Sequence, residues 1–241
     1  MRALDPEVVD TVWAAVEAKI PPHPENHPLG CHRPRVRDRD CFEAMLVRLV
    51  TGCSWEDAER LCGKKVSDTT ARARRDEWIE AGIFTAIVEE AITAYDKIIG
   101  LDLSDVAVDG ANRNDSVLLA PTLDGLFAPG LLHDIETIWL DRGYDSTATR
   151  DRLEERGIHD AVIAKKRKRG DARGKQRQPM GLRWPVERTN SWLSNFGQLR
   201  RNTDRKTRHR LAQLALAVVF IITAKLIDWR NRWSPGCVPI R

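Results

Sequence analysis

Three acidic residues lie where an α/β protein commonly carries its catalytic carboxylates. Asp109 closes the expected strand Asp105–Asp109 just before Gly110, and Asp141 closes the expected strand Thr137–Leu140 just before Arg142. Carboxylates at the ends of adjacent strands converge on one edge of a sheet, where Glu187 from a later helix could join them. Such a cluster repels itself unless divalent cations neutralise it, and its hard oxygen ligands suit Mg²⁺ or Mn²⁺. Two ions of this kind can clamp the attacking and leaving oxygens of a phosphodiester.

The same acids also have a purely structural explanation. Asp is an ordinary turn former at a strand end, and Glu187 could pair with Arg183 or Arg188 on its own helix. The local charge favours the catalytic alternative. Residues 165–210 contain 16 Lys and Arg against three acids, a net charge of +13, whereas the whole chain carries +4. A polyanionic substrate explains the acids and the basic segment together.

The densest part of the basic segment is a run of five consecutive cations, namely Lys165, Lys166, Arg167, Lys168 and Arg169. A run of one sign repels itself unless a polyanion is near. The run could be a solvated loop, but the basic residues continue into a Trp-rich segment with helical character. We therefore predict that these five residues bind DNA phosphates.

Composition restricts the class of protein further. Apolar residues make up 42% and charged residues 31% of the 241 residues, which is enough apolar surface for a core and excludes wholesale disorder. Five Cys without a CxxC pair argue against a disulfide scaffold or a ribbon-type zinc site. The longest apolar stretch, Leu214–Ala224, is shorter than the ~20 residues of a membrane span. We expect a cytoplasmic protein without a membrane partner.

The elements that must position these residues begin with helices. Residues 41–99 are predicted to be almost entirely helical, because apolar residues recur at helical spacing from Phe42 to Val50. Ser54 and Ser67 are typical N-caps of two further helices. A last helix is expected from about Trp78 to Ile98, broken or bent near Gly82.

The helix that begins at Ser67 is a candidate for DNA recognition. It carries Arg72, Arg74 and Arg75, which we expect on its polar face. Such a helix could lie in a major groove with these side chains directed at phosphates or guanines. The alternative is a solvated helix of a dimerisation domain.

From Leu101 the pattern changes to short strands that alternate with helices. Strands are expected at 105–109, 137–140 and 161–164, and helices at 116–126, 148–156, 185–199 and 208–229. The last helix is apolar on nearly all sides from Leu211 to Ile227, so we expect it to back the sheet. The alternation predicts a mixed α/β fold with parallel strands, preceded by a helical N-terminal domain.

Several segments resemble the bacterial insertion-sequence transposases of the IS-five type. Residues 41–78 resemble the helix-turn-helix domain of that family. Four later segments also match, namely Val108–Gly110, Ala111–Ser116, Leu140–Asp145 and Arg183–Thr189. Together the matches cover most of residues 40–200, and the last two segments are specific.

The resemblance implies an RNase H-like core in which Asp109, Asp141 and Glu187 are the DDE acids and metal ligands. It implies Mg²⁺- or Mn²⁺-dependent cleavage and strand transfer at terminal inverted repeats in double-stranded DNA. It further implies a homodimer on DNA and a bacterial, nucleoid-associated protein. Arg183 matches the Arg of the family's Tyr-Arg-Glu-Lys signature, and with Arg188 it is expected to contact DNA.

The resemblance also sets the expected domains. Residues 1–40 form an N-terminal helix and linker, 41–99 a helix-turn-helix-like DNA-binding domain, 101–230 a truncated RNase H-like DDE catalytic domain, and 231–241 a tail.

Two features depart from the family pattern. The Tyr and Lys positions of the signature hold Met180 and Ser194. The family has a strand hairpin after the first acid, whereas here Asp109 and Gly110 run straight into Ala111. We infer an internal deletion, which would leave about three strands with the first at an open edge. This predicts weak or absent catalysis.

Two alternatives to an active transposase follow. One is a non-catalytic DNA-binding protein that represses an intact relative. The other is a metal-dependent nuclease that uses the same acids for hydrolysis. Metal-dependent nicking separates both enzymes from the binding protein, and joining of the cut end to a target separates the transposase from the nuclease.

Overall fold

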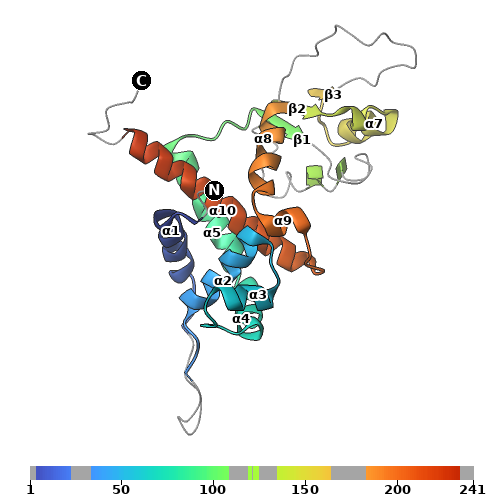
Figure 1. Cartoon of the computed structure of the whole chain (residues 1–241). Helices are drawn as coiled ribbons and strands as arrows, with labels where there is room; N and C mark the ends of the chain where they lie inside the picture. Colours follow the sequence, from blue (N-terminus) through green and yellow to red (C-terminus); the bar gives the residue numbers. More distant parts are fainter. Residues whose placement is uncertain are drawn as a thin grey trace, which may run out of the picture. The chain divides into compact units, whose positions relative to one another are not determined.

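The structure is a computed structural model of the whole chain, and it describes residues 4–22, 34–108, 119–120, 122–124, 135–163 and 183–233 (Figure 1). The chain divides into two units. Unit 1 comprises residues 1–100 and 191–241, and unit 2 comprises residues 101–190. The chain therefore leaves unit 1 after residue 100 and returns to it at residue 191.

Unit 1 consists of helices in the part that the structure describes. These are α1 (Pro6–Glu17), α2 (Asp38–Thr51), α3 (Trp55–Leu61), α4 (Asp68–Glu80), α5 (Ile83–Ile98), α9 (Gly197–Arg201) and α10 (Thr207–Trp233). Helix α8 (Arg183–Ser194) begins in unit 2 and ends in unit 1.

The helix boundaries follow from local chemistry. The Ser54 hydroxyl accepts a hydrogen bond from the Asp57 backbone N–H at 3.0 Å and begins α3. The Ser67 hydroxyl does the same for the Thr70 N–H at 3.2 Å and begins α4. Each cap satisfies a donor that has no partner within its helix. The break near Gly82 is present, because this residue has φ of 70° and separates α4 from α5. The two caps and the break at Gly82 are confirmed, whereas Trp78, expected at the start of the last helix, belongs to α4.

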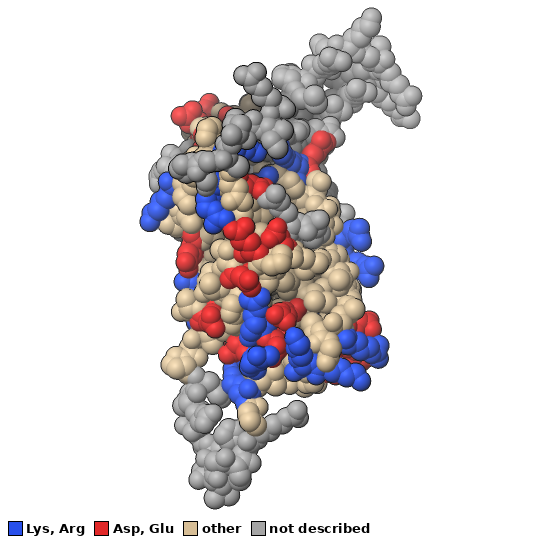
Figure 2. Space-filling model, turned by 60° about the vertical axis from the view of Figure 1, so that its left-hand side comes forward, with Lys and Arg blue, Asp and Glu red and all other residues tan. Residues whose placement is uncertain are grey.

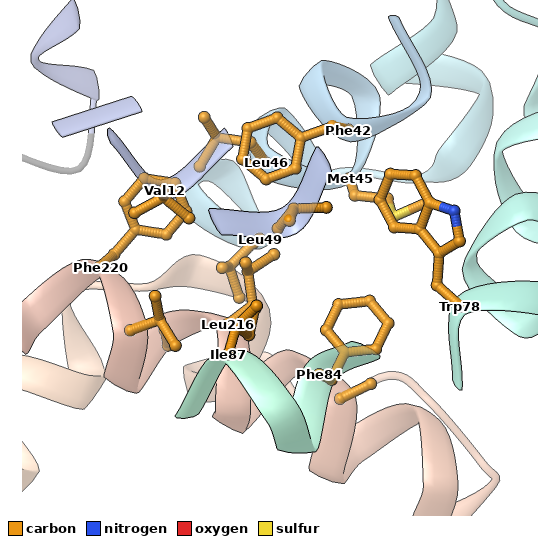
Figure 3. Close-up of a cluster of buried hydrophobic side chains, with 14 of the residues drawn as sticks. Val12, Phe42, Met45, Leu46, Leu49, Trp78, Phe84, Ile87, Leu216 and Phe220 are labelled. Atoms are coloured by element: carbon orange, nitrogen blue, oxygen red, sulfur yellow. The ribbon is translucent and has the colours of Figure 1, made fainter. Parts of the chain in front are cut away.

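The core of unit 1 combines helices from both ends of the chain (Figure 3). Phe42 of α2 stacks on Phe220 of α10 with ring centroids 6.3 Å apart. Trp78 of α4 and Ile87 of α5 lie in the same cluster, and both are at most 2% exposed. Burial of this apolar surface is the main driving force that unites the N-terminal and C-terminal segments in one unit.

Helix α10 packs within unit 1, and the expectation that residues 211–227 back the sheet was wrong. Its buried residues Leu216, Ala217 and Phe220 belong to the core formed with α1, α2 and α5. An apolar pattern around a helix predicts burial but does not specify the neighbours. By length and composition alone α10 could also cross a membrane, with a mean hydropathy of 2.0 in its most apolar window. A helix buried in a protein core can have the same length and hydropathy.

Unit 2 contains a parallel sheet. Its described strands are β1 (Asp105–Val108), β2 (Thr137–Leu140) and β3 (Ala161–Ile163), in the order β1-β2-β3. A 3-10 turn, η3 (Arg142–Tyr144), and helix α7 (Thr147–Glu154) connect β2 to β3. The predicted mixed α/β class with parallel strands is confirmed. Strand β1 forms an edge of the described sheet.

A small second core supports this sheet. Ile138, Leu140, Tyr144 and Leu153 are at most 4% exposed and pack with Leu119 and Leu123. Of the helix expected at 116–126, the structure describes residues 119–120 and 122–124 as helical, and the rest lies outside the described residues. The helix expected at 185–199 is in fact two helices, α8 and α9, because α8 ends at Ser194.

Candidate functional site

The carboxyl edge of the sheet is the first candidate site. Strands β1 and β2 are parallel, and Val108 is the register partner of Leu140. The residue after each of these in the sequence is an acid, Asp109 after Val108 and Asp141 after Leu140. Asp109 lies outside the described residues.

Asp141 has an exposed side chain on an anchored backbone. Its carbonyl oxygen accepts a hydrogen bond from the Tyr144 N–H at 3.0 Å, and the Tyr144 side chain is fully buried. The Tyr144 carbonyl in turn accepts from the Ser146 N–H at 2.8 Å, and Ser146 caps α7. The Asp141 carboxylate has no hydrogen-bond or ion-pair partner among the residues that the structure describes.

Glu187 lies in α8 and is exposed, as is the neighbouring Arg188. Of the three predicted acids, the structure thus describes two. Within the described ranges no group of three His, Cys, Asp or Glu side chains is arranged to hold a metal ion, and Asp109 is not among those residues. The predicted cations Lys165, Lys166, Arg167, Lys168 and Arg169 also lie outside the described residues, as does the side chain of Arg183.

Two of the three arginines expected on the polar face of α4 are buried, which corrects that expectation. Arg74 is 3% exposed, forms ion pairs with Asp38 and Glu77, and donates to the Val36 carbonyl at 3.3 Å. Burial lowers its pKa, and Arg35 contributes to the same shift. These contacts hold the segment before α2 onto α4. Arg74 is therefore not available to DNA in this fold.

Arg75 is 6% exposed and is also a structural residue. Its guanidinium lies 2.9 Å from the Asp76 carboxylate and 3.2 Å from Nε2 of His209, and it lies over the Trp55 ring at 5.2 Å. The sequence could not reveal this, because His209 is far away along the chain. Arg75 joins α4 to α10 and is not available to DNA in this fold.

Arg72 is the exposed member of the three. It forms an ion pair with Asp68 one turn earlier at 2.9 Å, with its side chain 48% exposed. Thr69 and Ala73 are exposed beside it at helical spacing. We call these three residues the open face of α4, which is the second candidate site; further along the helix Glu77 and Glu80 are also exposed.

A buried charge cluster escaped the sequence analysis. Asp204, between α9 and α10, is 8% exposed, and its carboxylate accepts from Arg48 at 3.3 Å and from Gln198 at 3.3 Å. Gln213 also donates to it, and Arg75 lies 4.0 Å away. We call Arg48, Arg75, Gln198, Asp204 and Gln213 the Asp204 cluster. The available signal was Arg48 inside the otherwise apolar stretch Ala44–Val50 of α2.

The electrostatics of this cluster are those of a buried site. Arg48 is 5% exposed and lies over the Trp55 ring at 4.8 Å. Burial lowers the pKa of Arg48, Asp204 opposes the shift, and Arg75 and Arg72 add to it. The Asp204 carboxylate thus serves two buried guanidinium groups, of which Arg75 also pairs with Asp76 outside the cluster at 2.9 Å. The evident role of the cluster is to seat α9 and α10 on α2 and α4.

Comparison with known proteins gives matches in both halves of the chain. A family model described as "Transposase DDE domain" matches residues 91–223. A second model, for proposed transposases of the IS4/5 family, matches residues 8–88. None of the solved structures matches significantly.

Two curated relatives come from insertion sequence IS402 of Burkholderia cepacia. One is a proposed transposase that is 37% identical over 103 residues, which are 40% of this chain and 46% of that protein. The other is a 16.2 kDa protein that is 28% identical over 109 residues, 44% of this chain and 72% of that protein. The match therefore spans less than half the length of the first relative.

Proposed function

Because this chain belongs to the DDE transposases of insertion sequences, we propose that it cleaves and joins DNA at the terminal inverted repeats of its element. Asp109, Asp141 and Glu187 are the proposed catalytic carboxylates. The family is built on an RNase H-like core, and the parallel sheet of unit 2 is the part of this chain that corresponds to it.

The observation that carries the proposal is the register of β1 and β2. Val108 and Leu140 are partners at the ends of two parallel strands, and each is followed in the sequence by one of the proposed acids. Peptide geometry keeps consecutive residues within about 3.8 Å of each other, so this register supports a common location for Asp109 and Asp141. Glu187 on the exposed surface of α8 is the proposed third member.

The donor chemistry suits Mg²⁺ or Mn²⁺. Asp141 offers an exposed carboxylate without a protein partner among the described residues, on a backbone anchored by Tyr144. A bound divalent cation would supply Lewis-acid stabilisation of the charge that develops on phosphate oxygens. The chain's own contribution is to fix the carboxylate: buried Tyr144 and the capped start of α7 hold the backbone that carries Asp141.

We propose that DNA binding uses surfaces other than the catalytic carboxylates. The exposed face of α4, formed by Thr69, Arg72 and Ala73, is the proposed element for the major groove. The proposed phosphate contacts are Lys165–Arg169, Arg183 and Arg188. We further propose a homodimer on the DNA and a cytoplasmic, nucleoid-associated location.

A second candidate is a DNA-binding protein without catalysis. It is favoured by β1, which is an edge of the described sheet and carries an exposed Asp105. A short edge strand is held from one side only, and an acid at its end is held less firmly. This agrees with the proposed deletion of a hairpin after Asp109. In this case the chain would bind the repeats and occupy them without cutting.

The experiment compares wild type, Asp141→Asn and the control Asp151→Asn on terminal-repeat DNA with Mg²⁺ and with Mn²⁺. Asn is nearly isosteric but lacks the ligand charge, so Asp141→Asn should abolish cleavage and leave DNA binding nearly intact. Asp151 is exposed on α7 and is remote from the proposed chemistry in sequence, so its variant should cleave normally. Equal cleavage by all three proteins would remove Asp141 from the catalytic set.

Further outcomes separate the alternatives. Binding without cleavage in either metal selects the non-catalytic protein, and cleavage without joining selects the nuclease. Hydrogen exchange across residues 105–108 tests the edge strand. Rapid exchange is expected for the non-catalytic protein, and strong protection together with robust turnover would contradict the proposed effect of the deletion.

A further inference from the structure

Four exposed cations lie close together where α9 turns into α10. They are Arg200, Arg201, Arg205 and Lys206, which we call the basic turn. None of them forms an ion pair with any residue that the structure describes. Some other exposed cations of unit 1 have acidic partners, as with Arg60 and Asp57 at 3.0 Å or Arg208 and Glu80 at 3.4 Å, whereas isolated ones such as Lys97 and Arg232 have none among the described residues. Figure 2 shows such interleaving of basic and acidic side chains on one face.

The one acid within the basic turn does not neutralise it. Asp204 points inward, is 8% exposed, and is shared by the buried guanidinium groups of Arg48 and Arg75. Helix α10, which starts directly after the turn, has no acidic residue in its first turn and carries Arg208 and Arg210 there instead. Cations are unfavourable at this positive end of a helix. Arg208 pairs with Glu80 at 3.4 Å and with Asp76 at 3.8 Å, whereas the four cations of the basic turn have no ion-pair partner among the described residues.

The backbone of the basic turn is held in one conformation. Asn202 adopts a left-handed conformation with φ of 43°, and its N–H bonds to the Gln198 carbonyl at 2.7 Å. The Gln198 side chain donates to Thr203 at 2.8 Å, and Arg210 Nε donates to the Asp204 carbonyl at 2.6 Å. A ligand bound by these cations would not have to order the backbone first, which favours affinity.

The basic turn lies near α4, because Arg208 at the start of α10 pairs with Asp76 and Glu80 of α4. Arg75 of α4 contacts His209 and lies beside Asp204, so the middle of α4 is packed against the start of α10. Arg72 is near enough to Arg48 in the Asp204 cluster to contribute to lowering its pKa. A duplex that received α4 in its groove would bring its phosphate backbone toward the basic turn.

We propose that the basic turn binds the backbone phosphates of double-stranded DNA beside the groove that α4 enters. It would do so as part of unit 1, separately from the cations at 165–169. Contacts of this kind fix the position of a protein on the duplex but do not read its sequence. This proposal rests on the proposed function, because it takes DNA as the polyanion.

The test measures the salt dependence of binding to a random-sequence DNA duplex. Each phosphate contact contributes about 0.9 to the slope of log K against log salt concentration. The double variant Arg205→Gln/Lys206→Gln should therefore lower the steepness of that slope by about 2. Adding Arg200→Gln and Arg201→Gln should lower the steepness of the slope by about 3–4 in total. The matched control Lys97→Gln/Arg232→Gln removes the same charge from exposed sites on α5 and at the end of α10 and should leave the slope unchanged.

Two further measurements make the proposal falsifiable. The affinity loss should be equal for random and terminal-repeat duplexes, whereas a loss confined to one sequence would mean base reading and overturn the proposal. The melting temperature of the variants should equal or exceed that of wild type, because the four cations have no ion-pair partner among the described residues. A lower melting temperature would mean that the cations serve the fold. A stronger loss on duplex RNA than on duplex DNA would likewise overturn the proposal.

The outcomes distinguish this inference from the proposed function. If wild type binds DNA and the salt slopes of the double and quadruple variants equal its own, only the proposal that the basic turn binds phosphates is overturned. Absence of any DNA binding by wild type would overturn both. Loss of cleavage in Asp141→Asn with an intact salt slope concerns the catalytic acids only and leaves the basic turn in place.

Discussion

Replacing Asp204 by alanine should destabilise unit 1 by about 3–5 kcal/mol. The carboxylate is 8% exposed and accepts hydrogen bonds from Arg48 and Gln198. Without it, the guanidinium groups of Arg48 and Arg75 stay 5% and 6% exposed with no common counter-charge. Breaking a buried ion pair from one side is costly because the remaining charge is neither paired nor hydrated.

Related variants separate charge from hydrogen bonding. Asp204→Asn keeps one oxygen acceptor and should cost about 1.5–3 kcal/mol, the usual value of hydrogen bonds to charged groups. In the Asp204→Ala background, Arg48→Met removes one unpaired charge and should restore part of the stability, so that the two substitutions are not additive. The matched control is Glu90→Gln, which breaks an exposed ion pair with Lys19 and should cost about 0–1 kcal/mol.

Urea denaturation followed by circular dichroism measures these changes, and hydrogen exchange in α9 and the first turns of α10 locates them. The Asp204 variants should exchange fastest there, because the cluster seats these helices on α2 and α4. If Asp204→Ala costs no more than Glu90→Gln, about 1 kcal/mol or less, the cluster does not hold the C-terminal segment. Unchanged exchange in α9 would refute the same reasoning.

Three shorter predictions concern the same unit. Gly197→Ala should destabilise it by about 1–3 kcal/mol in urea denaturation, because a Cβ there would collide with the Thr51 carbonyl oxygen. Burial and the Arg75 guanidinium lower the pKa of His209 below its ordinary 6.5 despite a nearby carboxylate. The unfolded state then binds more protons, so the unfolding free energy should fall as pH decreases through about 6.5, and less so in His209→Gln. Burial raises the pKa of Cys41 to about 11, so thiol reagents should modify it only after unfolding.

Each of these predictions has a clear contrary result. Gly63→Ala, where a Cβ would meet nothing within 4 Å, is the control for the steric part of the Gly197 effect, although its φ of 66° adds backbone strain. Because Gly197 does not have a positive φ, the absence of any loss in Gly197→Ala would exclude the collision. A pH profile identical in wild type and His209→Gln would exclude this histidine. Fast labelling of Cys41 in the native protein would contradict its burial.

Much of the local structure was predictable from the sequence. Ser54 and Ser67 begin helices, Gly82 interrupts one, and the three predicted strands are present with bounds shifted by at most one residue. Caps and hydrophobic periodicity depend on residues within one or two turns, so a linear pattern contains the necessary information. The family followed from contiguous segments for the same reason, and the matches at residues 8–88 and 91–223 confirm it.

The three proposed catalytic acids differ from these local features. Asp109, Asp141 and Glu187 are predicted from strand ends and from resemblance, and they remain a prediction. The register of Val108 with Leu140 supports the pairing of the first two. Convergence of three carboxylates depends on side chains from separate elements, and no local pattern specifies the distances between them.

The partners of α10 and of the buried arginines could be known only from the packed chain. Asp204 and Arg48 are 156 positions apart, yet they meet in a buried ion pair. Arg74 and Arg75 look like surface cations in a helix rich in polar residues, and they are buried because α2 and α10 cover that side of α4. Local sequence determines which residues form a helix and where it ends. Which side becomes buried depends on the apolar surface that distant segments bring, since hydrophobic burial is non-directional and acts between whatever surfaces the chain can unite.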